Sequence, residues 1–145
     1  MIRAVVVLTG VLVACGGVVA CSGDDDAAEV PSGVTSVVDA FNDAINTYDT
    51  EALLAVTTED FTWESTGDVQ SRPEFVEHFE EYYEVGRFHA ESTDEPEVKS
   101  DGGAYVVEVP GRVTSAGYDG DGLSVYRVVE VDDSWMVQEF RWSEI

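Results

Sequence analysis

The feature that most constrains the fold is a change in the spacing of the apolar residues near position 86. Before it they recur every three to four positions, as on one face of a helix, and after it they alternate, as in a strand. Helices first and strands separated by turns afterwards are typical of the α+β class. We therefore predict helices packed on one face of a strongly curved antiparallel sheet.

The first half predicts three helices and one strand. Apolar spacing gives a first helix from residue 34, broken at 46–49, a short helix over 51–56 and a strand over 61–65. Ser71, Pro73 and Glu74 are typical of a helix start: serine caps free amides, proline suits the first turn, and glutamate completes a capping box. The helix that follows carries its apolar residues on one face: Phe75, Val76, Phe79, Tyr82 and Tyr83.

The second half predicts an antiparallel meander. Strands are expected over 87–99, as one long or broken strand, and over 104–115, 123–131 and 134–142. Glycine and aspartate predict the turns between them, at 101–103, 119–122 and 132–133.

The N-terminal segment indicates export. Arg3 is the only charge before Asp24, and a short apolar run ends in small residues. This pattern is typical of a secretory signal peptide. The residues "VVAC" at 18–21 resemble the lipobox of bacterial lipoproteins, in which the cysteine is lipidated and becomes the new N-terminus. The resemblance implies a signal peptide over 1–20, lipidated Cys21 with an acidic flexible tether over 21–33, and a domain over 34–145. The protein is expected on the outer face of the cell membrane, held there by its lipid.

Two alternatives remain open for this segment. "LVAC" at 12–15 also fits, but processing at Cys15 would leave apolar Val18 and Val19 on the tether, so we prefer Cys21. An uncut anchor is the other alternative, since residues 4–23 carry no charge and are barely long enough to span a bilayer. Processing at Cys21 would leave no free thiol for a disulfide, a metal or nucleophilic catalysis.

The charge of the chain excludes one class of partner. Asp and Glu number 30 against 7 Lys and Arg, giving a formal net charge of −23. Nucleic-acid binding of the usual electrostatic kind is excluded, because phosphate contacts need basic residues. The acids are spread along the chain, so we interpret them as solubility or adaptation to salt.

Four stretches together resemble one superfamily. "NTYDTEALLAVTTEDFTWES", "SRPEFVEHFEEYY", "SDGGAYVVEV" and "DDSWMVQEFRW" follow one another as in the NTF2-like superfamily, which includes SnoaL-like proteins and ketosteroid isomerases. The resemblance covers residues 34–145. It implies a cone whose sheet wraps around the helices and leaves a pocket at the wide end. Function does not follow from this fold, which hosts enzymes, binding proteins and assembly modules.

The resemblance also allows a test for isomerase chemistry. By register, the carboxylate base of the isomerases falls at Ser65 and their tyrosine donor near Phe41, and neither residue can do that work. Glu64 is expected to point outward, because Phe61 and Trp63 alternate inward.

The expected ligand pocket contains four residues that combine size with a polar group: Trp63, Tyr83, His89 and Tyr126. Glu74, His78 and Glu81 share one side of a helix, but one helix rarely completes a metal site. We interpret them as a solvated acidic stripe and expect no metal and no cofactor.

The sequence favours a cell-envelope lipoprotein whose domain binds a small apolar ligand or a protein partner without catalysis. One alternative is a SnoaL-like enzyme (an isomerase, cyclase or dehydratase) that uses His89 and a carboxylate. Another is a structural module that forms a homodimer through the outer face of the sheet.

Overall fold

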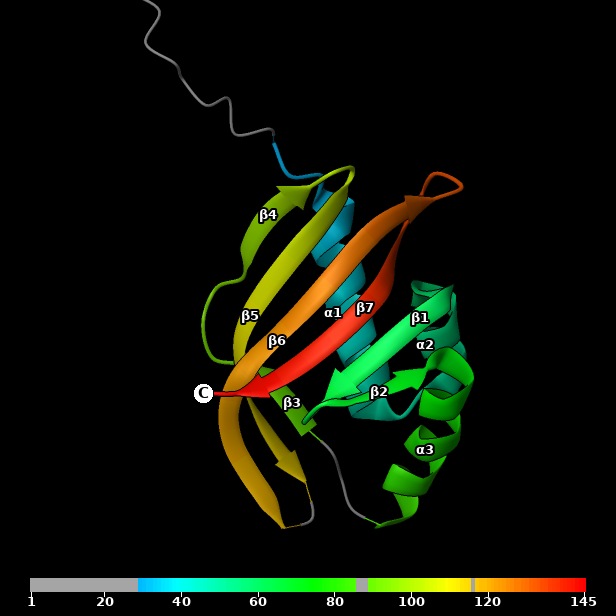
Figure 1. The fold of residues 1–145 in the computed structure, drawn as a ribbon, viewed down its shortest axis with the longest axis vertical. Helices are drawn as coiled ribbons and strands as arrows, with labels where there is room; N and C mark the ends of the chain where they lie inside the picture. The colour runs from blue at the N-terminus through cyan, green and yellow to red at the C-terminus, as the bar shows by residue number, and fades with distance from the viewer. Residues whose placement is uncertain (1–28, 86–88, 116) are drawn as a thin grey trace, which may run out of the picture.

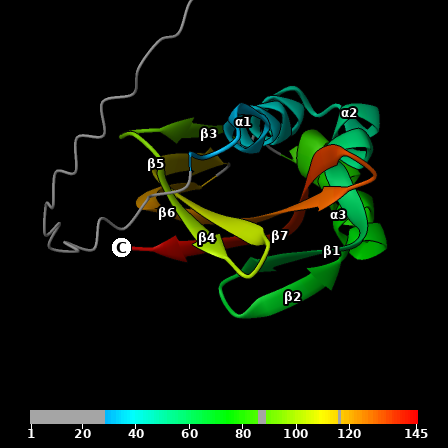
Figure 2. The ribbon, with the colours of Figure 1, turned by 90° about the horizontal axis from the view of Figure 1, so that it is seen from above.

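Three helices lie on the same side of one curved sheet (Figures 1 and 2). The computed structural model describes residues 29–85, 89–115 and 117–145, without the side chains of residues 80 and 82–85. The helices are α1 (Ser32–Thr47), α2 (Thr50–Val56) and α3 (Arg72–Val85). Helix α1 therefore includes the last two residues assigned to the tether. The predicted signal peptide, Cys15 and Cys21 lie outside the described residues.

The sheet has seven strands and is mixed. In spatial order, β2-β1-β7-β6-β5-β3 form one path, and β4 also pairs with β5. The bounds are β1 (Thr57–Ser65), β2 (Asp68–Ser71), β3 (His89–Ser92), β4 (Glu97–Asp101), β5 (Ala104–Ser115), β6 (Tyr118–Val131) and β7 (Ser134–Glu144).

The α+β prediction is confirmed, but the prediction of an antiparallel sheet is wrong at one pair. Strands β1 and β7 run parallel, with Trp63 opposite Phe140 and Ser65 opposite Trp142. A tight hairpin forces its two strands to be antiparallel. No hairpin joins β1 to β7, which come from opposite ends of the domain, so their direction is set by the elements on either side.

Helix α1 buries its apolar face against the sheet. Phe41, which is 1% exposed, lies at the centre of this contact. Its ring lies 5.9 Å from that of Phe61, 5.7 Å from that of Tyr126 and 5.6 Å from that of Phe140. One helical side chain thus holds strands β1, β6 and β7 together.

The predicted helix break is confirmed at Tyr48. Its backbone is left-handed, with φ of 57°, and its amide donates to the carbonyls of Ala44 and Ile45. Asp49 then caps α2, accepting from the amide of Ala52 at 2.9 Å. The Tyr48 ring stacks on Phe79 of α3 at 5.4 Å, so the break also anchors the third helix.

The predicted start of α3 is confirmed, with one difference in its hydrogen bonds. Glu74 accepts from the backbone amide of Ser71 at 2.9 Å, as a capping box requires. The Ser71 hydroxyl also donates to the Glu74 carboxylate, at 2.6 Å. These bonds lower the pKa of Glu74.

The region predicted as one long or broken strand over 87–99 is broken. Strands β3 and β4 both pair with β5, β3 along residues 111–114 and β4 along 104–108. Pro96 lies between them, and proline has no amide hydrogen to donate to a ladder.

The turn predicted at 119–122 is wrong, because these residues belong to β6. The chain reverses at Gly117, whose φ is +87°. Arg112 of β5 donates to both carboxylate oxygens of Asp119, at 2.7 and 2.8 Å. This bidentate pair joins the two strands across the extended hairpin.

Asn46 fastens the end of α1 to the edge strand β3. Its amide nitrogen donates to the carbonyl of Ala90, and its amide oxygen accepts from the Ala90 nitrogen, both at 2.9 Å. One side chain thus satisfies both backbone groups of Ala90, as a neighbouring strand would. Among the described helices, none is both long and apolar enough to cross a bilayer.

Replacing Asn46 by alanine is expected to lower the free energy of unfolding by about 1–3 kcal/mol, because Ala90 loses both partners at a half-buried position. Urea denaturation measures the loss. Thr47→Ala is the matched control, since the Thr47 hydroxyl donates only to Asp43 of its own helix. Equal losses in the two variants would contradict the role given to Asn46.

Candidate functional site

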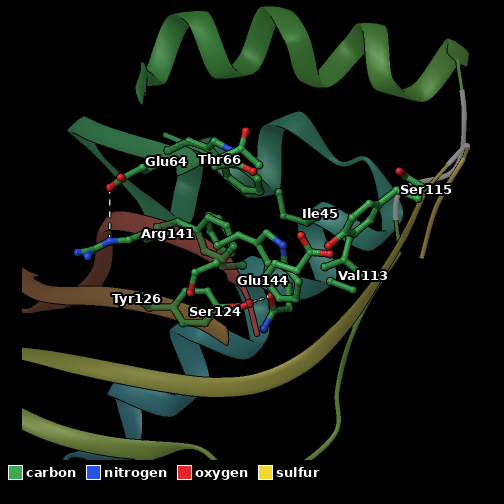
Figure 3. Close-up of a pocket in the computed structure, with 18 of the residues that line it drawn as sticks. Ile45, Glu64, Thr66, Val113, Ser115, Ser124, Tyr126, Arg141 and Glu144 are labelled. Carbon is green, nitrogen blue, oxygen red and sulfur yellow. Dashed lines mark hydrogen bonds and ion pairs between the residues drawn. The ribbon is translucent and has the colours of Figure 1, made fainter. Parts of the chain in front are cut away.

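A cavity of about 570 Å³ opens between α1 and the concave face of the sheet. Side chains from α1, β1, β3, β5, β6 and β7 line it (Figure 3). This volume is within the usual range for small-molecule sites.

Strand alternation and register decide which side chains face the cavity. Along β6, Ser124 and Tyr126 are buried while their neighbours are only half-buried. Tyr126 lies opposite Phe140, and Ser124 lies opposite Trp142. Because facing residues in neighbouring strands share a side of the sheet, these four side chains form two inward rows.

The wall of the cavity nearest α3 is built from stacked rings. Trp63 lies 4.2 Å from Phe140 and 4.3 Å from Phe75, measured between ring centroids. Phe140 in turn stacks on Phe41 of α1. Phe41, Trp63 and Phe140 line the cavity and also pack in or against the core, so core packing holds this wall in place.

Tyr126 supplies the most buried polar group of the cavity. The residue is 2% exposed, and its hydroxyl donates to the Asn42 side-chain oxygen at 2.7 Å. Burial raises the pKa of the Tyr126 phenol to about 12. At neutral pH the phenol therefore keeps its proton and acts as a hydrogen-bond donor.

Two glycines of β6 make room for aromatic rings on the concave face. A Cβ on Gly122 would lie 2.4 Å from Cζ2 of Trp142, and one on Gly120 would lie 2.5 Å from Oη of Tyr118. Only glycine allows the two rings to approach the strand this closely. The stretch mistaken for a turn is thus strand backbone beneath two rings, those of Tyr118 and Trp142, that line the cavity.

Of the two described carboxylates that line the cavity, Glu64 is paired with an arginine and Glu144 is not. Glu64 pairs with Arg141 at 3.4 Å, and Figure 3 shows this pair turned away from the centre. Glu144 lies among the lining side chains, between Ser124 and Val113 in the same view. No hydrogen bond or ion pair joins the Glu144 carboxylate to another residue within the described ranges.

A second, more polar cavity of about 380 Å³ adjoins the first. Asp39 and Asp43 of α1 and Glu91 of β3 line it. Both cavities share six lining residues, among them Asn42 and Tyr126. The hydrogen bond between these two side chains therefore lies where the cavities meet.

Comparison with known proteins identifies the family. Residues 38–137 match the family model described as a SnoaL-like domain. The chain belongs to the SnoaL-like family. No curated protein matches it.

Solved structures show the same NTF2-like fold. The chain superposes with a TM-score of 0.66 on a protein of unknown function from Mycobacterium tuberculosis, at 24% identity over 78% of this chain and 70% of that one. The TM-score with a candidate ketosteroid isomerase from Shewanella frigidimarina is 0.65, at 16% identity over 77% of this chain and 95% of that one. The TM-score with a candidate dehydratase of the NTF2-like family from Streptomyces avermitilis is 0.67, at 17% identity over 78% of this chain and 94% of that one.

The SnoaL-like domain brings only some of the predicted pocket residues together. Trp63 and Tyr126 line the large cavity. His89 does not: it lies opposite Thr114 on the outer face of the sheet, exposed and 3.8 Å from Glu91. Strand alternation explains this correction, because Ala90 takes the inward position in β3. Tyr83 lies in α3, but its side chain is outside the described residues.

Ser65 and Phe41 both line the cavity, so the two positions matched to the isomerases face it in this chain. Sequence analysis missed Asn42 and Glu144 as lining residues, and it did not select Trp142 from the aromatic residues for the pocket. Alternation from Phe140 through Trp142 to Glu144 would have found the last two. Within the part of the chain that the structure describes, no three His, Cys, Asp or Glu side chains lie close enough to hold a metal ion.

Tyr126 is expected to make stability depend on pH in the alkaline range. Because its pKa is raised from 10 to about 12, the folded state keeps a proton that the unfolded state has lost. The stabilisation is complete below pH 10 and is lost as the pH rises to about 12. Urea denaturation should show the stability gap between wild type and Tyr126→Phe shrinking over this range, by up to about 2–3 kcal/mol. The same narrowing in Tyr105→Phe, outside the cavity, would contradict the assignment to Tyr126.

Proposed function

We propose that this protein is a cell-envelope lipoprotein whose SnoaL-like domain binds a small apolar ligand without transforming it. The observation that carries the proposal is the preformed cavity of about 570 Å³, walled by the rings of Phe41, Trp63 and Phe140. A concave, largely apolar site with a few polar groups is the general form of a small-molecule site.

The polar groups of the cavity support binding more than acid–base catalysis. Phe41 and Ser65 stand at the positions where the isomerases carry their donor and base. The Tyr126 hydroxyl already donates to Asn42, and its pKa of about 12 makes it a poor acid at neutral pH. His89, the residue on which the enzyme alternative depended, lies outside the cavity lining.

Filling the cavity is expected to abolish binding. Ser65→Trp places an indole at an inward position of β1, and the affinity for the neutral fluorescent probe N-phenylnaphthylamine should fall by roughly tenfold or more, because the probe loses its space. Fluorescence titration of the full-length chain measures the affinity. Thr62→Trp is the matched control, on the opposite face of the same strand. If Ser65→Trp binds the probe as wild type does, the cavity is not the site.

Export and anchoring form the other half of the proposal and depend on the cysteine of "VVAC". In a bacterial host, Cys21→Ser is expected to lose the acyl mass and move from the membrane to the soluble fraction. Cys15→Ser is the matched control and should remain acylated and membrane-bound. Fractionation and intact-mass measurement distinguish the two. Loss of acylation in Cys15→Ser alone would transfer the modification to the earlier cysteine.

A further inference from the structure

We infer that the ligand of the large cavity carries a positive charge, as an amine or quaternary ammonium group, and that Tyr118, Trp142 and Glu144 hold this group. The inference rests on the proposed ligand-binding function and adds the chemical class of the ligand.

The three residues line the same cavity, and each lies next to a glycine of β6. The Trp142 ring lies directly on Gly122, and the Tyr118 ring lies on Gly120, two residues away on the same face. Glu144 is the register partner of Gly122 across the ladder. All three residues line the same cavity, so two aromatic rings and one carboxylate border it beside this stretch of β6.

The carboxylate of Glu144 has no counter-ion within the described chain. Arg141, the nearest base along the strand, is paired with Glu64 and points away from the cavity (Figure 3). The other bases described with side-chain partners are also engaged: Lys99 with Glu97 and Glu108, Arg112 with Asp119 and Asp121, and Arg127 with Asp101. Glu144 is exposed, so its carboxylate is solvated at the cavity lining and is accessible to a cationic group of a ligand.

The adjoining cavity adds negative charge on its far side. Asp39 and Asp43 of α1 line it, and Arg112, the one base among its described lining residues, shares its charge with two aspartates. Clefts lined by one sign of charge concentrate ions of the opposite sign. Asp39 and Asp43 therefore disfavour an anionic ligand in the adjoining cavity.

A cationic ligand would interact favourably with all of these groups. Ring faces of tryptophan and tyrosine attract ammonium groups, and the attraction grows when the site excludes water. A carboxylate adds a charge-assisted contact. A neutral ligand would gain nothing from Glu144 and would have to desolvate it. The apolar wall of Trp63 and Phe140 would then receive the uncharged part of the molecule.

The test compares three probes of equal size: phenethyltrimethylammonium, its neutral isostere with carbon in place of nitrogen, and a phenylalkyl carboxylate. Isothermal titration of the full-length chain, corrected for binding to empty micelles, gives each affinity. The cation should bind roughly tenfold more tightly than the neutral isostere, and the carboxylate should bind most weakly. In Glu144→Gln, the affinity for the cation should fall to the affinity for the neutral isostere. Glu130→Gln, which removes an exposed carboxylate of β6 outside the cavity lining, is the matched control.

Each outcome decides between the two proposals. If the neutral isostere binds as tightly as the cation in the wild type, the charge inference is wrong while ligand binding stands; this comparison needs no variant to fold. If Glu144→Gln and Glu130→Gln weaken binding of the cation equally, the overall charge of the protein, and not Glu144, attracts the cation, and the inference is overturned. If none of the three probes binds, ligand binding in this cavity fails together with the inference.

Discussion

The contact of Phe41 with the concave face of the sheet is the interaction on which the rest of the domain depends. Its ring meets side chains of β1, β6 and β7, so one residue of α1 ties the parallel pair β1–β7 to the antiparallel meander. The same helix turn presents Asn42 and Ile45 to the cavity. The apolar face of helix α1 packs on the sheet, and Asn42, next to that face, lines the cavity. Core and site are two parts of one helix–sheet contact.

The cavity persists because several inward positions are filled by residues that cannot close it. Ser65, Ser115 and Ser124 line it with small side chains where a packed core would place a valine or leucine. A well-packed interior leaves few spaces larger than a water molecule. The rings of Tyr118 and Trp142, which lie on the backbone of Gly120 and Gly122, line the cavity without closing it. Stability that more complete packing would add is given up here, which is the usual relation between a binding site and its scaffold.

Local signals predicted local structure, while pairing between distant strands escaped them. The break at Tyr48, the helix start at Ser71 and the strand over 104–115 follow from spacing and capping residues alone. The parallel pairing of β1 with β7 joins opposite ends of the domain, and no local pattern encodes it. The residues 119–122 were misinterpreted because glycine beside aspartate is typical of turns; in the fold, glycine is required there by the Trp142 and Tyr118 rings. The prediction that His89 lines the pocket was wrong by one position: Ala90 faces inward, and a shift of one residue reverses the face of a strand.

The position of individual carboxylates matters more for the cavity than the net charge of −23. At physiological ionic strength, interactions between exposed charges are largely screened beyond about 8 Å. Glu144 on one side, and Asp39, Asp43 and Glu91 on the other, line the cavities themselves. The sequence alone explains the acidic composition as solubility; the proposed cation site gives one of these carboxylates a local role, because Glu144 lines the aromatic cavity.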